Sequence, residues 1–135
     1  MQFELLKSFA QEGPLTVVVN GDCMQTTFPR NSHLLLERMR IYWPGDAVAF
    51  KRGDGKIVCH RFLGYLPTHR GWCILTRADN SARADMPVFV RHVLGRATRV
   101  DDQPFLPEVK DRLRALMLYL PAIVQQFSRR FRASE

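Results

Sequence analysis

Residues 47–62 read Ala47-Val48-Ala49-Phe50-Lys51-Arg52-Gly53-Asp54-Gly55-Lys56-Ile57-Val58-Cys59-His60-Arg61-Phe62. Two runs rich in apolar residues, Ala47–Phe50 and Lys56–Phe62, flank the turn signal Gly53-Asp54-Gly55. Glycine tolerates the positive φ that tight hairpin turns require. The stretch therefore predicts two antiparallel strands joined by a short turn, and a fold in which β-structure dominates.

Further short strands are predicted on both sides of this hairpin. They are separated by turn signals such as Pro44-Gly45-Asp46 and Asp79-Asn80-Ser81. The additional strand candidates are Leu15–Val19, Leu34–Glu37, Trp72–Thr76, Val88–Val90 and Val93–Thr98. A chain of 135 residues can bury a core without disulfide or metal staples, so we expect residues 1–100 to form one mainly β domain.

Helices are predicted at both ends of the chain. Residues 1–12 form a short amphipathic pattern that Gly13-Pro14 stops. Its apolar members are Phe3, Leu5, Leu6 and Phe9. Residues 101–135 are expected to form a helical extension, in which Pro107 suits the first turn and Pro121 should kink or split the helix near residues 119–120.

The C-terminal helix carries an apolar stripe whose members recur every three or four residues. They are Leu113, Leu116, Leu120, Val124, Phe127 and Phe131. Packing of the stripe on the β-domain is the commoner outcome for such a pattern. The alternatives are insertion into a membrane interface, with arginines toward anionic headgroups, and docking to a partner protein.

The formal net charge of +7 is the outlier of the composition. Its arginines crowd the last quarter of the chain, as Arg112, Arg114, Arg129, Arg130 and Arg132. A basic surface attracts nucleic acid, anionic lipid or acidic partners, although a plain solvated face carries equal weight. No helix-turn-helix or RNA-binding motif accompanies the charge, so we do not expect nucleic acid as a partner.

Cysteine usage and hydropathy indicate a compartment. The three cysteines form no C-x-x-C pair, and an odd number suits a reducing cytosol. Residues 1–12 contain no apolar run of signal-peptide length, and no uncharged stretch reaches 18 residues. We therefore expect a cytoplasmic protein, with peripheral membrane contact through the C-terminal helix as the alternative.

Four segments of residues 15–100 stand out by their order. They are Gly21-Asp22-Cys23-Met24, Pro44–Phe50, Val58–Phe62, and Thr76–Asn80, which continues through Asp85 to Val93–Arg96. In this order they resemble the G-x-S-M, G-D-x-V, H-R-V and T-K-G-D-N…D…G-x-V motifs of the catalytic domain shared by signal peptidases and LexA-type self-cleaving repressors. The resemblance implies a partly open β-barrel.

The third segment resembles one branch of that superfamily. Bacterial leader peptidases and LexA-type proteins place a lysine where this chain has His60, whereas the endoplasmic-reticulum and archaeal type place a histidine there. The resemblance implies Cys23 as the nucleophile in place of the usual serine, His60 as the general base and Asp85 as the orienting acid. Asp79 would support the loop of the site, with the roles of the two aspartates exchangeable.

The segment around Cys23 would also bind the substrate and the oxyanion. Bacterial members place a hydroxyl donor where this chain has Gly21, so the backbone N–H of Cys23 or the side chain of Asn20 would donate instead. Met24 completes the motif on its other side.

A Cys-His-Asp set suits the hydrolysis of a peptide bond. The reaction needs a thiolate, a base that takes the thiol proton, and a carboxylate that fixes the imidazole tautomer. The expected function is thus cleavage of a peptide, leader or signal segment, without a cofactor or a catalytic metal. A substrate would add as an extended strand near Cys23.

Other readings of the same residues stay open. Cys23, Gly21 and Thr26 depart from the family motif, which favours a degenerate peptidase fold that binds a peptide or protein without cleaving it. A lone cysteine is most often a small buried hydrophobe, and a histidine on a strand is usually structural. Zinc held by Cys23, His60 and Asp85, and self-cleavage of the LexA type, are the less favoured alternatives.

Overall fold

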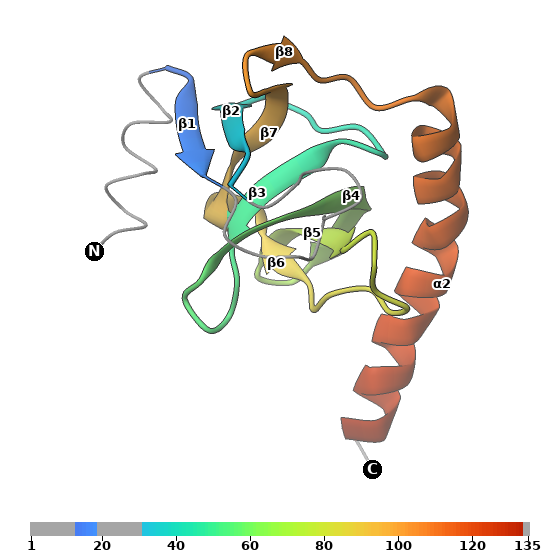
Figure 1. Ribbon diagram of the computed structural model, residues 1–135. Coiled ribbons are helices and arrows are strands. Elements are labelled where there is room, and N and C mark those ends of the chain that lie inside the picture. The colour runs from blue at the N-terminus through green and yellow to red at the C-terminus, as the bar shows by residue number, and fades with distance from the viewer. Residues whose placement is uncertain (1–12, 19–30, 134–135) are drawn as a thin grey trace.

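The computed structural model describes residues 13–18 and 31–133, the last five by their backbone alone. The described chain contains eight strands, one short 3-10 turn and one long C-terminal helix (Figure 1). In order they are β1 (Leu15–Val18), β2 (His33–Glu37), β3 (Ala47–Lys51), β4 (Ile57–Thr68), β5 (Gly71–Arg77), β6 (Val88–Phe89), the 3-10 turn η1 (Val90–His92), β7 (Val93–Val100), β8 (Gln103–Pro104) and α2 (Val109–Ala133).

The strands form a single antiparallel sheet that curls into a half-barrel (Figure 1). The order is β1-β2-β7-β3-β4-β5-β6, with β8 added beside β7. Register shifts occur between Leu35 and Leu36, between Ala49 and Phe50, and between Phe62 and Gly64. Such bulges increase the local twist of a strand, and here they accompany the curl of the sheet. The mainly β prediction for residues 13–100 is confirmed for the described residues.

The hairpin predicted around Gly53-Asp54-Gly55 joins β3 to β4. The backbone N–H of Arg52 donates to the carbonyl of Lys56 at 2.8 Å, and Gly55 adopts a φ of 87°. This left-handed conformation is one that glycine adopts at little cost. The predicted strand Lys56–Phe62 is only the first half of the observed β4, because the chain keeps pairing with β5 beyond the bulge at Gly64.

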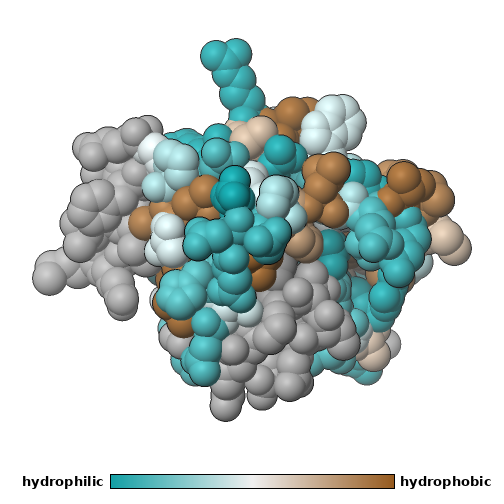
Figure 2. All heavy atoms as spheres, turned by 45° about the horizontal axis from the view of Figure 1, so that its top comes forward, coloured by the Kyte–Doolittle hydropathy of each residue, from teal (hydrophilic) through white to brown (hydrophobic). Residues whose placement is uncertain are grey.

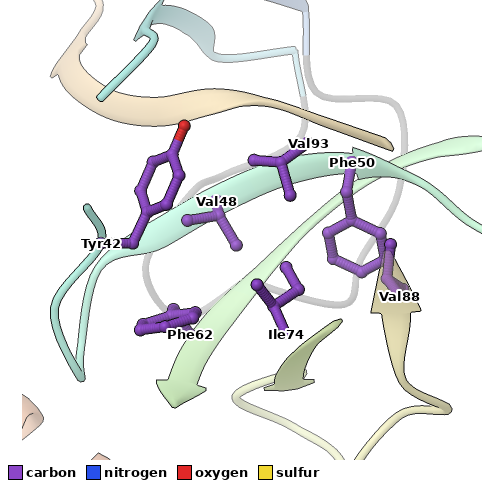
Figure 3. Close-up of a cluster of buried hydrophobic side chains, with 7 residues drawn as sticks. All are labelled: Tyr42, Val48, Phe50, Phe62, Ile74, Val88 and Val93. Atoms are coloured by element: carbon purple, nitrogen blue, oxygen red, sulfur yellow. The ribbon is translucent and has the colours of Figure 1, made fainter. Parts of the chain in front are cut away.

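Two apolar clusters lie on opposite faces of the sheet. Side chains alternate along a strand, so Ala47 and Ala49 of β3 pack in one cluster, whereas Val48 and Phe50 pack in the other. Figure 3 shows the second cluster. Its buried members are Tyr42, Val48, Phe50, Phe62, Ile74, Val88 and Val93. The candidate site described below lies on the same face of the sheet as this cluster.

The helix α2 packs on the face of β4 that carries Leu63. Small residues let it approach closely: Ala115 and Ala122 are buried against Leu63 and Leu75. The helix begins after Glu108, whose N–H donates to the side chain of Asp111 at 3.1 Å, so that Pro107 lies before the first turn rather than in it.

One expectation for the C-terminal helix is wrong, and a second is wrong in part. The apolar stripe from Leu113 to Phe127 does not pack on the β-domain, because the opposite, alanine-bearing side of α2 does. The helix is continuous from Val109 to Ala133, so Pro121 does not split it, whereas a kink near residues 119–120 stays a prediction. Pro121 is exposed, so its ring lies away from the face of α2 that packs on the sheet. Proline has no backbone N–H to donate, but this missing hydrogen bond does not affect the contacts between α2 and the sheet. The helix predicted for residues 1–12 lies outside the described residues.

Candidate functional site

His60 is a buried histidine in the middle of β4. It pairs across the sheet with Val48 of β3, and its side chain lies on the face of the second apolar cluster. Only 3% of the residue is exposed, and its ring meets the Phe50 ring edge-on with 5.7 Å between centroids. The neighbouring Cys59 points to the other face and packs against the first cluster. Strand alternation thus separates this histidine from the thiol beside it.

Asp85 reaches His60 from the loop that connects β5 to β6. The backbone N–H of Asp85 donates to the carbonyl of Thr76 at 2.8 Å, which ties the loop to the end of β5. Its Oδ2 then accepts two hydrogen bonds, from the Thr76 hydroxyl at 2.7 Å and from His60 Nδ1 at 2.5 Å. The Asp85 side chain is partly buried and that of His60 almost fully buried, so the contact is sheltered from solvent.

This geometry assigns the tautomer of His60. A carboxylate only accepts hydrogen bonds, so Nδ1 carries a proton, and in the neutral form of the ring Nε2 then carries the lone pair. Nε2 is buried and has no hydrogen-bond partner among the described residues. A buried polar atom without a partner is uncommon in proteins and marks a functional position or a group that another segment satisfies. The described part of the site therefore presents one basic nitrogen.

Asp79 has a different partner. Its carboxylate accepts from the Arg61 guanidinium at 2.7 Å and 3.2 Å, and Arg61 also donates to the carbonyl of Gly45 at 2.9 Å. Arg61 follows His60 on β4 and points to the opposite face of the sheet. Asp79 thus holds the base of the loop that carries Asp85, through a contact on the far side of β4, and it is Asp85 that contacts His60.

A second buried acid ties the second sequence motif to the helix. Asp46 is 1% exposed and accepts from the backbone N–H of Trp43 at 2.9 Å. Its carboxylate also meets Arg112 of α2 at 3.2 Å and Arg96 of β7 at 3.6 Å. A buried carboxylate requires such cationic partners. Asp46 therefore has a structural role here.

The sequence motifs predicted no role for Thr76, but in the structure Thr76 lies in the site. Thr76 is fully buried, and its hydroxyl and carbonyl both contact Asp85. The signal was present, since Thr76 opens the same sequence segment that contains Asp79. A buried hydroxyl needs a partner, and a carboxylate nine residues along the chain provides it here.

The remaining predicted site residues lie outside the described part of the chain. These are Asn20, Gly21, Cys23 and Met24. Of the described thiols, Cys59 has a pKa that burial raises to about 12, against the weaker opposing effect of Arg61, so it is not the thiolate that the site needs. No group of three or more His, Cys, Asp or Glu side chains within residues 13–18 and 31–128 could hold a metal ion.

An open groove lies on the same face of the sheet as His60. It has a volume of about 1000 Å³ and is lined largely by apolar and aromatic side chains. Met39, Tyr42, Tyr65 and Val93 line it and also belong to, or pack against, the second apolar cluster, which contains the Phe50 that contacts His60. Trp72 adds an exposed aromatic wall. Such a groove suits a ligand with apolar side chains.

Comparison of the chain with protein-family models gives no matching family, and comparison with curated proteins gives no match.

Proposed function

We propose that this protein is a peptidase that cleaves a peptide, leader or signal segment through Cys23, His60 and Asp85. The single observation that carries the proposal is the buried His60–Asp85 contact, which leaves the basic Nε2 without a partner among the described residues. The order of the sequence segments, in which Cys23 occupies the nucleophile position of a resembling family, supports the choice of the third member.

The proposed reaction follows from this arrangement. Nε2 of His60 takes the proton of the Cys23 thiol, and the sulfur attacks the scissile carbonyl carbon to form a tetrahedral intermediate. The imidazolium then gives the proton to the leaving amine, which leaves a thioester on Cys23. Water, deprotonated by the same Nε2, hydrolyses the thioester and regenerates the thiol. Asp85 stabilises the imidazolium through its contact with Nδ1.

The groove supports a peptide substrate with apolar or aromatic side chains. The groove is lined in part by residues of the second apolar cluster, and His60 lies on the same face of the sheet as that cluster. An extended peptide in the groove would therefore lie on the same face of the sheet as the base. Arg38 and Arg40 line the groove beside Glu37, which makes its polar edge mainly basic. Main-chain hydrogen bonds to an open strand edge would set the register of such a segment.

The test is cleavage by the wild type and two variants at Cys23. Candidate leader peptides with aromatic and aliphatic residues are incubated with the wild type, Cys23→Ala and Cys23→Ser, and products are identified by mass spectrometry. We expect cleavage by the wild type and none by Cys23→Ala, with equal peptide binding by both. Binding by both proteins without cleavage by either would replace the proposal with the alternative, a degenerate fold that only binds peptides, which the departures at Gly21 and Thr26 favour.

Alkylation by iodoacetamide tests the site without a substrate. If His60 stabilises a Cys23 thiolate, the pH midpoint of alkylation falls well below the value of about 8.5 for a free thiol. At pH 6, a midpoint lowered by about three pH units raises the thiolate fraction over 200-fold, and the lower nucleophilicity of such a thiolate reduces the gain to about tenfold. Cys23 that reacts at the same rate in the wild type and in His60→Ala would contradict the role of His60.

A further inference from the structure

The outward face of α2 is apolar along most of its length. Seven large side chains on it are more than half exposed: Val109 (74%), Leu113 (56%), Leu116 (52%), Met117 (78%), Leu120 (69%), Val124 (62%) and Phe127 (58%). We call these residues the outer stripe. Figure 2 shows hydrophobic residues reaching the surface on the right of the molecule, the side on which α2 lies in Figure 1. Contiguous apolar surface of this kind marks an interaction site.

The outer stripe and the packed face lie on opposite sides of the helix. At 3.6 residues per turn, Ala122 is turned by half a circle from Leu113, and Ala115 lies close to Ala122. The alanines are buried against β4 and β5 while Leu113 faces solvent. No rotation of α2 could therefore bury both faces against the sheet. The stripe extends over 19 residues, about 28 Å at 1.5 Å per residue.

The charged residues near the outer stripe indicate what kind of surface binds to it. Lys110 and Arg114 flank it on one side, whereas Asp111 lies toward the packed face, where it accepts from the N–H of Glu108. The exposed pair of Lys110 with Glu108 leaves the lysine solvated and contributes little. Residues 108–133 contain six basic and two acidic side chains, and one of the six, Arg112, pairs with Asp46 on the packed side of the helix. Pairing of the stripe with a second copy would bring like charges together, whereas an anionic surface would neutralise them.

We propose that α2 binds in the plane of an anionic membrane through the outer stripe, with its basic side chains at the lipid headgroups. An interfacial helix combines an apolar face with flanking Lys and Arg, and its affinity depends on both. Within the described part of the chain, no helix is sufficiently long and apolar to span a membrane. Membrane binding by α2 is independent of any chemistry at His60.

The sheet would stand between the membrane and the candidate site. Leu63 and Leu75 face α2, whereas the intervening residues of the same strands face the second apolar cluster, where His60 and Thr76 lie. A membrane bound to the outer face of α2 would leave His60 on the side directed toward the aqueous phase. If the peptidase proposal holds, the bound enzyme would act on segments that reach it from solution.

Vesicle sedimentation tests the membrane inference. The full chain is mixed with vesicles of phosphatidylcholine alone or with 30% phosphatidylglycerol, at about 0.1 M salt. We expect at least tenfold stronger binding to the anionic vesicles, weakened by high salt. Leu116→Ser/Leu120→Ser should lose most of this binding while keeping its circular dichroism, because both side chains are exposed.

Paired charge variants separate local from overall electrostatics. Each basic residue near an anionic surface strengthens binding about fivefold, so Lys110→Gln/Arg114→Gln should weaken it by about 25-fold. The control Lys56→Gln/Arg70→Gln removes two exposed charges from the β3–β4 and β4–β5 turns, outside α2, and should change binding by less than about threefold. Equal binding to neutral and anionic vesicles, or unchanged binding by the serine variant, would overturn the inference. A dimer that the serine variant abolishes would instead assign the stripe to a second copy and would also overturn it.

Discussion

Replacement of Asp85 by Asn tests whether the contact with His60 sets the reactivity of the site. Asn keeps the shape of Asp, and its carbonyl oxygen can still accept from the Thr76 hydroxyl and from His60 Nδ1. The substitution therefore removes the negative charge and little else. A purely structural Asp85 would tolerate this change, whereas an Asp85 that stabilises an imidazolium would not.

The magnitude follows from the hydrogen bonds that lose their charge. A hydrogen bond to an ionised group contributes about 1.5–3 kcal/mol, against about 0.5–1.5 kcal/mol for a neutral one. The 2.5 Å contact to a nearly buried His60 falls in the stronger class. Its loss destabilises the imidazolium by about 1.5–2.5 kcal/mol, which corresponds to a rise of about one to two pH units in the midpoint of thiolate formation at Cys23. Peptide cleavage should fall by about 10- to 70-fold, which is the rate equivalent of the same 1.5–2.5 kcal/mol.

The assay is the pH dependence of Cys23 alkylation by iodoacetamide, with the site identified by peptide mass spectrometry. Asp79→Asn is the matched control, since it removes the same charge from the same loop but from a carboxylate that pairs with Arg61. It should lower the free energy of unfolding and leave the midpoint within about 0.3 pH units of the wild type. An unchanged or lower midpoint in Asp85→Asn would contradict the role of Asp85 in stabilising the imidazolium, as would an equal rise in both variants.

Two further predictions concern stability. Burial raises the pKa of Cys59 to about 12, so the thiol of the unfolded chain loses its proton before that of the folded chain as the pH rises above about 9. The free energy of unfolding should then fall by up to about 1.4 kcal/mol per pH unit. Chemical denaturation of the wild type and Cys59→Ala at pH 9 and pH 11 should show a smaller fall in the variant. Gly64→Ala would place a Cβ within 2.6 Å of Tyr119 Cδ2 and should cost about 1–3 kcal/mol by urea denaturation, whereas Gly53→Ala, with nothing within 4 Å, should cost less than about 0.5 kcal/mol.

Local sequence patterns predicted most of the sheet. Each strand candidate of residues 34–98 corresponds to an observed strand, because short runs between turn residues have few other ways to satisfy their backbone groups. The pairing of β2 with β7 and of β7 with β3 could not be predicted in this way, since it joins segments far apart in the chain. The sequence also did not predict the short strand β8. Gln103 and Pro104 have no strand-like sequence pattern, and they pair with β7 only because the chain turns back beside it.

The C-terminal helix shows where periodicity misleads. Its pattern predicted a helix but selected the wrong packed face, since the rule that the most apolar face packs inward weighs hydrophobicity and ignores shape. Gly64 leaves room for the Tyr119 ring, whose hydroxyl donates to the carbonyl of Tyr65. Alanines at 115 and 122 let the backbones approach, so complementary shape decided which face packs against β4. The larger apolar residues were left free for another surface.

The alternation of β4 connects the two proposals. Arg61 and Leu63 point toward the side where Asp79 and α2 lie, and His60 and Phe62 point toward the second apolar cluster. A substitution on one face should therefore leave the function of the other intact. The serine variant of the outer stripe should lose vesicle binding yet retain the alkylation profile of Cys23, and Asp85→Asn should do the reverse. Loss of both properties in either variant would show that the two faces are coupled, which strand alternation alone does not provide.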